Sequence, residues 1–193
     1  MSRKNSRTAI LDAALELITR RGEAGVTMAE IAKAARVSRQ AVYLNFADRG
    51  DLLLALVRYV DEKRGLAAEI QKLVDAPTGL AALRGLVDLQ ARMNPGVWAA
   101  ARALDAVRRT DEAAERSWQD RLNSRLDGCR LLVSRLAAEG ALRPGVDPAA
   151  AADLIWSVTS LRTWEDLVLQ RGWTPDQYVE RIYRLLRGAL TSS

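Results

Sequence analysis

Hydrophobic residues along this chain recur at steps of three and four, and strict alternation of hydrophobic and polar residues is hard to find. This period is typical of amphipathic helices that bury one face. In the first segment, Ile10, Ala14, Leu17 and Ile18 share one face of a helix expected over residues 6–21. The same period continues almost to the end of the chain, which predicts an all-α protein with about nine helices.

Capping residues mark where these helices begin. Thr27 and Glu30 have the spacing of a capping box, and Ser38, Asp48 and Asp147 are good N-cap residues. Asp147 is followed by a proline at the first helical position, where the missing N–H does no harm. The expected helices cover residues 6–21, 27–35, 38–45, 48–73, 78–93, 95–108, 111–139, 148–170 and 175–190.

The composition restricts the chemistry. Of the 193 residues, 49% are hydrophobic, so the chain can bury a core without a disulfide. Histidine is absent and Cys129 is the one cysteine, which excludes catalytic histidines, an intrachain disulfide and a cysteine-rich zinc site. Cys129 lies on the hydrophobic face of its helix, which predicts a buried structural thiol. We therefore expect no metal and no cofactor.

Membrane insertion and secretion are also disfavoured. The longest uninterrupted hydrophobic run, Leu52 to Val57, is too short to cross a bilayer. The first residues lack the hydrophobic stretch of a secretory signal, so we expect a cytoplasmic protein with no membrane partner.

The positive charge is concentrated near the N-terminus. The net charge is +5, and residues 1–50 carry nine basic against five acidic side chains. A local basic excess attracts a polyanion such as DNA. A solvated surface that is simply basic would show the same excess, so the charge alone does not decide between them.

Residues 27–46 have the pattern of a helix-turn-helix motif. Ala32 is small enough for the helix crossing, Val37 supplies a hydrophobic residue in the turn, and Ile31 and Val42 are expected to face the core. The second helix then exposes polar side chains suited to base edges and phosphates. An ordinary helical hairpin with solvated polar residues is the alternative.

The first fifty residues resemble the DNA-binding domain of TetR-family transcriptional regulators. The matching stretches, about a quarter of the chain, are residues 10–17, 21–22, 27–35, 37–39, 42–43, 46 and 51–53. The resemblance implies a three-helix DNA-binding domain over residues 1–50 and a helical effector-binding and dimerisation domain over residues 51–193. It implies a repressor that binds a palindromic operator on double-stranded DNA as a homodimer and is released by a small-molecule effector.

The resemblance also implies which side chains meet DNA. The matching positions are Thr27, Ser38, Arg39, Gln40, Tyr43, Asn45 and Arg49. An N-terminal arm of Arg3 and Lys4, together with Arg7, is a further candidate for DNA contact, and a frayed basic tail is the alternative.

Four positions depart from the family pattern. Arg36 stands where a turn glycine is usual, so a non-glycine residue must adopt the turn conformation. Leu44 and Asn45 replace a common aromatic residue and histidine, which changes the expected base preference. Gly50 replaces a polar residue near the start of the next helix, which predicts a looser joint there.

The remainder of the chain holds all five tryptophans. Trp98, Trp118 and Trp156, with Arg102, are candidates for a pocket that takes a small apolar or amphipathic effector. Tryptophans at helical spacing more often belong to a core or an interface, and Arg102 can instead pair with Asp105.

The last two predicted helices are hydrophobic on broad faces, as expected of a two-fold four-helix interface. The candidate dimer residues are Leu161, Trp164, Val168, Tyr178, Ile182, Leu185 and Leu186. If these side chains were buried within one chain instead, the protein would be a monomer.

Two other functions compete with the effector-controlled repressor. One is a DNA-binding regulator without a small-molecule effector, either constitutive or controlled by a protein. The other is an enzyme that uses carboxylates such as Asp105 or the pair Glu165 and Asp166. These carboxylates have arginine neighbours in helical sequence and no histidine to work with, so we expect no catalysis.

Overall fold

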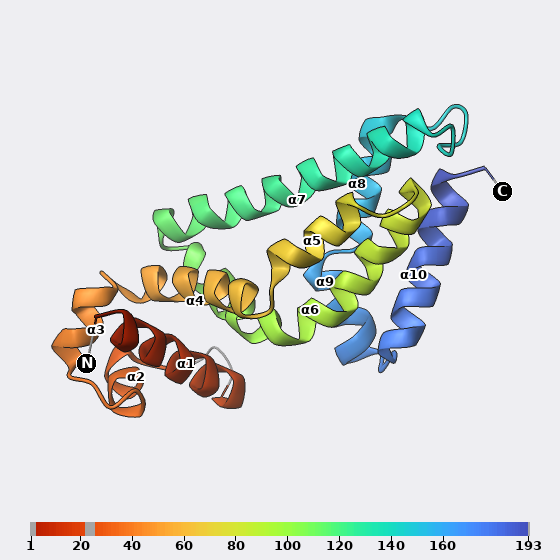
Figure 1. Cartoon of the computed structure of the whole chain (residues 1–193). Coiled ribbons are helices and arrows are strands. Elements are labelled where there is room, and N and C mark those ends of the chain that lie inside the picture. The colour runs from red at the N-terminus through yellow and green to blue at the C-terminus, as the bar shows by residue number, and fades with distance from the viewer. Residues whose placement is uncertain (1–2, 22–25, 193) are drawn as a thin grey trace. The chain divides into compact units, whose positions relative to one another are not determined.

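The computed structural model describes residues 3–21 and 26–192, and helices form most of this part of the chain (Figure 1). The predicted all-α fold is confirmed. The helices are α1 (Arg3–Arg21), α2 (Met28–Ala34), α3 (Arg39–Asn45), α4 (Arg49–Lys63), α5 (Leu66–Val74), α6 (Gly79–Arg108), α7 (Glu112–Ala138), α8 (Pro148–Val158), α9 (Leu161–Trp164), the π-helical η1 (Glu165–Gln170) and α10 (Pro175–Leu190). Within the described residues, no helix is both long and hydrophobic enough to cross a membrane.

The predicted break at Pro95 is wrong, because α6 runs through it as one helix. A proline in a helix removes one backbone hydrogen bond and disfavours the helix before it. The neighbouring side chains Met93 and Val97 are buried on either side of the proline. Burial of a hydrophobic face is therefore strong enough here to hold the helix together across the missing bond.

Two helices predicted as continuous are interrupted. Gly65 has a φ of 69° and separates α4 from α5, since this left-handed conformation ends a helix. The predicted helix over residues 148–170 stops at Thr159, whose hydroxyl donates to the carbonyl of Ile155 at 2.7 Å. Ser160 then caps α9 by accepting from the amide of Thr163 at 3.1 Å. Hydroxyl side chains that bond to nearby backbone end the helix although the hydrophobic period continues.

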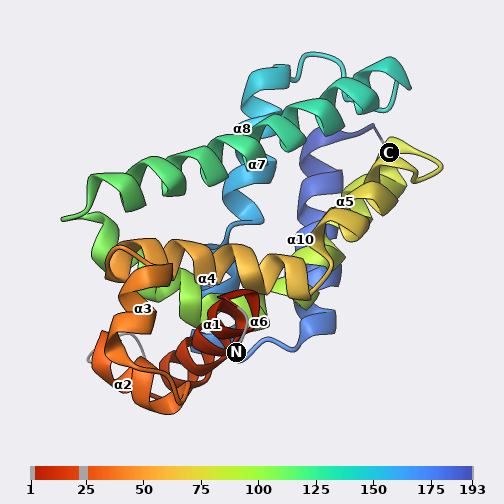
Figure 2. The same ribbon diagram turned by 60° about the vertical axis from the view of Figure 1, so that its left-hand side comes forward.

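The chain forms two compact units. The first unit comprises the described residues within 1–64 and 96–120, and the second those within 65–95 and 121–193. In the first unit α1 packs against α2, α3 and α4, and α2 packs against α3 (Figures 1 and 2). Ile10, Ile31 and Val42 are buried in this core together with Leu52 and Leu56 of α4. The unit thus continues beyond residue 50, where the sequence suggested a domain boundary.

In the second unit α10 packs against α8 and η1. The C-terminal end of α7 is tied to the segment between α5 and α6. Glu139 accepts a hydrogen bond from the amide of Gly79 at 2.7 Å, and Arg135 donates to the carbonyl of Val74 at 3.1 Å. The buried side chains of this unit include Leu136 and Ile155. Buried hydrophobic side chains and these hydrogen bonds of charged side chains therefore hold the helices of the unit together.

Candidate nucleic-acid interface

The helix α2 begins with the predicted capping box. The hydroxyl of Thr27 accepts from the amide of Glu30 at 3.2 Å, and Glu30 accepts from the amide of Thr27 at 2.9 Å. Arg21, at the end of α1, donates to the same carboxylate at 2.8 Å. These hydrogen bonds, the one from the Thr27 backbone above all, lower the pKa of Glu30. The Thr27 hydroxyl is thus already engaged at the start of α2.

The turn between α2 and α3 has the predicted conformation. Arg36 has a φ of 54°, the one positive value found outside glycine in the described residues. The next amide, of Val37, donates to the carbonyl of Ala32 at 3.0 Å. Ser38 then caps α3 by accepting from the amide of Ala41 at 3.1 Å. These bonds hold α3 at a fixed angle to α2.

The helix α3 exposes three of the predicted DNA-contacting side chains. Arg39, Gln40 and Tyr43 are exposed, and none makes a hydrogen bond to another described residue. Asn45 differs, because it is half-buried and its amide donates to the carbonyl of Ala41 at 2.8 Å. One amide donor of Asn45 is therefore used within α3, whereas the side chains of Arg39, Gln40 and Tyr43 are available to a partner.

Arg7 of α1 supports the end of α3. Its guanidinium donates to the carbonyl of Asn45 at 2.9 Å and lies 4.4 Å from the centre of the Phe46 ring. Arg7 is therefore tied to the end of α3, and its part in a DNA-binding arm stays a prediction. Arg3 and Lys4 lie in the first turn of α1, and their side chains fall outside the described part of the structure.

A polar cluster joins α1 to α4. Tyr59 and Lys63 of α4 each donate to the carboxylate of Asp12 at 2.8 Å. Burial raises the pKa of Asp12, but the hydrogen bonds from Lys63 and Tyr59 outweigh it and lower the pKa overall. This cluster holds α1, the helix that carries Arg7, against α4, the helix that follows α3.

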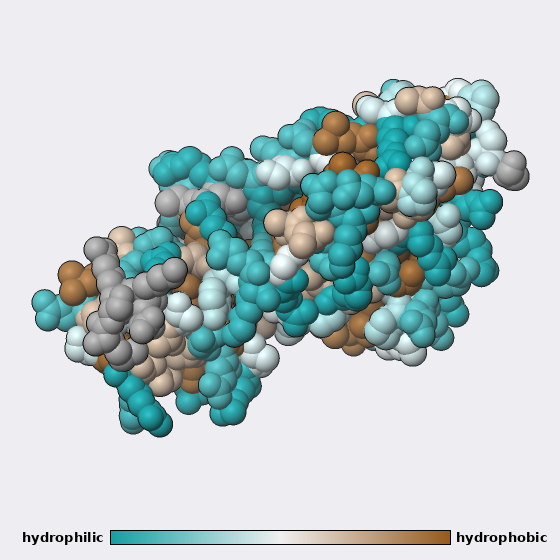
Figure 3. All heavy atoms as spheres, in the orientation of Figure 1, coloured by the Kyte–Doolittle hydropathy of each residue, from teal (hydrophilic) through white to brown (hydrophobic). Residues whose placement is uncertain are grey.

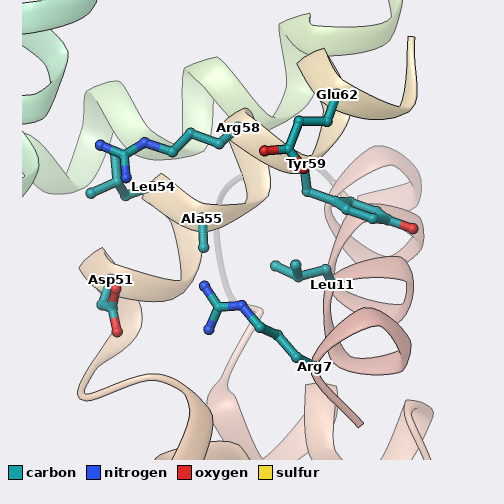
Figure 4. A pocket seen from close by; sticks show the side chains of 8 residues that line it. All are labelled: Arg7, Leu11, Asp51, Leu54, Ala55, Arg58, Tyr59 and Glu62. Atoms are coloured by element: carbon teal, nitrogen blue, oxygen red, sulfur yellow. The ribbon is translucent and has the colours of Figure 1, made fainter. Parts of the chain in front are cut away.

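Beside this cluster lies a groove between α1 and α4, with a volume of about 270 Å³ (Figure 4). Its lining residues carry both signs of charge, with Arg7 and Arg58 as the cations and Asp51 and Glu62 as the anions. Such mixed charge favours neither an anion nor a cation. We therefore assign this groove no ligand.

The start of α4 is packed more tightly than the sequence suggested. Gly50 is buried, and a Cβ atom at this position would lie 2.1 Å from a carboxylate oxygen of Asp111. The other oxygen of Asp111 accepts from the amide of Ala114 at 3.0 Å, near the start of α7. The predicted loosening is thus wrong, because the missing side chain lets Asp111 approach. Arg49, the last predicted DNA contact, is the first residue of α4 and is half-buried.

The predicted effector residues fall in different units. Trp98, Arg102 and Trp118 belong to the first unit and Trp156 to the second. Arg102 is exposed at a surface hollow, and Trp118 lies 5.3 Å from the guanidinium of Arg108. A pocket built from all four residues therefore stays a prediction.

Four of the seven predicted dimer residues are buried within their own chain. These are Trp164, Tyr178, Ile182 and Leu186. A side chain that is already buried offers no surface to a partner, so they must be removed from the prediction. Leu185 is 55% exposed, and Leu161 and Val168 are half-buried. Figure 3 shows separate hydrophobic patches on a mostly hydrophilic face.

Sequence reasoning missed Arg125 of α7. It is half-buried in the second unit, where it donates to the backbone carbonyl of Trp156 at 3.0 Å. A signal was present, because Arg125 interrupts the hydrophobic spacing of Leu122, Leu126 and Cys129. The predicted burial of Cys129 is confirmed.

Comparison with known proteins finds a family similarity in the first part of the chain. Residues 10–56 match the model of bacterial regulatory proteins of the tetR family, over the helices described above. This part of the chain is therefore similar to the DNA-binding part of that family. The "HTH-type transcriptional repressor LfrR" of Mycolicibacterium smegmatis is 36% identical to this chain over 94 residues, which are 49% of this chain and 48% of the relative. The match thus spans about half of that relative's length.

Solved structures show that the whole chain has the TetR-family fold. NalD, the secondary repressor of the MexAB-OprM multidrug efflux pump in Pseudomonas aeruginosa, is 25% identical with a TM-score of 0.68, and the match covers 98% of this chain and 97% of NalD. FadR from Bacillus subtilis, solved in complex with stearoyl-CoA, is 19% identical with a TM-score of 0.76 over 93% of this chain and 96% of FadR. At 19% identity, the likeness to FadR concerns the fold alone.

Proposed function

We propose that this protein is a transcriptional repressor that binds a palindromic DNA operator as a homodimer and is released by a small-molecule effector. The observation that carries the proposal is the free polar surface of α3, where Arg39, Gln40 and Tyr43 have no described hydrogen-bond partner. A helix that only packs in a core, or a plain helical hairpin, does not require a set of exposed polar side chains without partners. The printed descriptions of LfrR and NalD as repressors support it.

The chemistry of α3 suits the major groove, which is wide enough to admit a helix. Arg39 can donate two hydrogen bonds to a guanine edge or pair with a phosphate, and the amide of Gln40 suits adenine. The hydroxyl of Tyr43 suits a phosphate oxygen, and Ser38 places the N-terminus of α3 where its amides also favour phosphate. Asn45 contributes less to base recognition, since its amide donor is engaged.

A dimer is needed to read a palindrome, with the two half-sites one helical turn of DNA or a small multiple apart. Leu185, Leu161 and Val168 remain as candidate interface residues. Release requires the effector to bind the arrangement that cannot hold DNA more tightly than the one that can.

The proposal is tested by operator affinity in matched arginine variants. Arg39→Ala removes a free cation on α3, and Arg20→Ala removes an exposed cation of α1 that pairs with Glu16 at 2.8 Å. A base contact is worth about 1–3 kcal/mol, so Arg39→Ala is expected to weaken binding by roughly tenfold or more. If Arg39 contacts phosphate instead, the slope of log affinity against log salt falls by about 0.9.

Fluorescence anisotropy with a DNA fragment selected by the wild-type protein provides the measurement. Arg20→Ala is expected to keep wild-type affinity and the wild-type salt slope. Equal binding by wild type and Arg39→Ala, in affinity and in salt slope, would remove α3 as the reading helix. Sedimentation of both variants checks that each remains a dimer.

A further inference from the structure

Arg125 of α7 lies in the second unit and has no counter-ion among the residues that the structure describes. Its Nη2 donates to the carbonyl of Trp156 at 3.0 Å and to the hydroxyl of Thr159 at 3.4 Å, and its guanidinium lies 5.6 Å from the centre of the Trp156 indole. Within the described part of the chain, no aspartate or glutamate forms an ion pair with it. A guanidinium has five N–H donors, so most of this capacity is unused by the protein.

The neighbours of Arg125 cannot neutralise it at pH 7. Burial raises the pKa of the Cys129 thiol to about 11 and the pKa of the Tyr178 phenol to about 12, although the charge of Arg125 opposes both shifts. Both groups are therefore uncharged. A charge taken out of water is costly unless it is paired, and an arginine cannot give up its proton. An anion supplied from outside would pair with it.

Tyr178 of α10 adds a second polar group without a partner. Its side chain is fully buried, and its hydroxyl oxygen has no hydrogen-bond partner among the described residues. Buried hydroxyls nearly always have a partner, so an orphaned one needs an explanation. Because the phenol remains protonated, it can donate a hydrogen bond to an incoming oxygen. α10 packs against α8, and Arg125 donates to the carbonyl of Trp156 on α8, so the cation and the unpaired donor belong to helices that meet in this unit.

We propose that the second unit binds a small molecule through a carboxylate group, which pairs with the guanidinium of Arg125 and accepts a hydrogen bond from Tyr178. Trp156 lies beside the guanidinium and provides an aromatic surface for the adjoining part of the ligand. One arginine and one hydroxyl match a singly charged, planar carboxylate, with which a guanidinium forms paired hydrogen bonds. The inference rests on the proposed effector control, because it names the chemical class of that effector.

A purely structural role for Arg125 is the competing explanation. Its two hydrogen bonds end on Trp156 and Thr159, at the C-terminal end of α8, where a cation suits the helix dipole. That role explains the bonds to α8. It does not explain the orphaned hydroxyl of Tyr178, and it predicts no preference for acids.

The test is calorimetric titration of the full-length protein with benzoate, phenylacetate and octanoate, each beside its neutral amide. We expect at least one acid to bind roughly tenfold or more tightly than its amide, as charge-assisted hydrogen bonds require. Arg125→Gln is expected to abolish this preference. Arg130→Gln is the matched control, since Arg130 lies on the same helix, is exposed and pairs with Asp127 at 2.9 Å.

Tyr178→Phe separates binding from structure. The change removes a hydroxyl that has no partner in the protein, so the variant should melt at the same or a higher temperature than wild type. The same variant should bind the acid several-fold more weakly. If Tyr178 had a structural role alone, acid binding would stay unchanged.

The proposal is overturned if no acid is preferred over its amide, or if Arg125→Gln keeps the preference with its fold intact by circular dichroism. Operator binding is measured separately, without acid. A protein that binds its operator but shows no acid preference overturns this inference alone. A protein that prefers acids but binds no operator overturns the proposed function and leaves the carboxylate site in place.

Discussion

The turn before α3 stores strain that a single substitution should release. Arg36 has a φ of 54°, a conformation that costs a residue with a side chain roughly 1–2 kcal/mol and costs glycine almost nothing. Glycine also raises the conformational entropy of the unfolded chain, which stabilises the unfolded state by about 0.4–1 kcal/mol. Arg36→Gly should therefore stabilise the protein by about 0.5–1 kcal/mol.

Arg36→Ala is the matched control. Both substitutions remove the same exposed cation, but alanine keeps the strained conformation. For a chain of this size, 1 kcal/mol corresponds to about 2–4 °C in melting temperature. Arg36→Gly should thus melt about 1–4 °C above Arg36→Ala, with the difference set by the backbone alone.

Thermal unfolding followed by far-ultraviolet circular dichroism measures the difference between the two variants. Because both lose the charge equally, they should bind the selected operator with the same affinity. Equal melting temperatures, or a lower one for Arg36→Gly, would refute the reasoning about strain. A difference in operator affinity between them would mean that the turn conformation itself changes when the side chain is lost.

Four further predictions concern packing, protonation and thiol reactivity. Gly50→Ala should destabilise the protein by about 1 kcal/mol, because its Cβ displaces the capping carboxylate of Asp111. Gly128 lies in the middle of α7, and no atom lies within 4 Å of a Cβ atom placed there. Gly128→Ala should therefore stabilise the protein by up to about 1 kcal/mol. Equal effects of the two substitutions in urea unfolding would contradict both predictions. Asp12→Asn should be less stable than wild type at pH 7. The difference should vanish as the pH falls through the lowered pKa of Asp12, because the folded state binds that proton less readily than the unfolded state; a difference that persists in acid would count against the cluster. Cys129 should resist a thiol reagent at pH 7 in the native protein and react rapidly in urea, since burial raises its pKa to about 11.

The features that the sequence predicted well are local ones. The capping box of Thr27 and Glu30, the N-cap at Ser38 and the strained turn at Arg36 depend on residues within four positions of one another. The spacing of residue types is enough to indicate such contacts. The exposed side chains of α3 follow from the same period, because a helix with one buried face has an exposed one.

The features that the sequence missed depend on contacts distant along the chain. Arg7 contacts Phe46 and the carbonyl of Asn45, which is 38 positions away, and no local pattern reveals that pairing. The same is true of Tyr178, whose hydrophobic spacing fits an interface as well as a core. Pro95 was misjudged for a related reason, since the burial that keeps α6 intact comes from the rest of the fold.

The most direct test of the account is a selection of genomic DNA fragments on the purified protein at near-physiological salt, followed by sequencing. Salt at this level suppresses binding that depends on phosphates alone. The account predicts one enriched palindrome, whose half-sites are separated by about one helical turn of DNA or a small multiple of it. Recovery of fragments without a shared sequence, from protein shown to be folded and dimeric, would contradict the claim that α3 reads an operator.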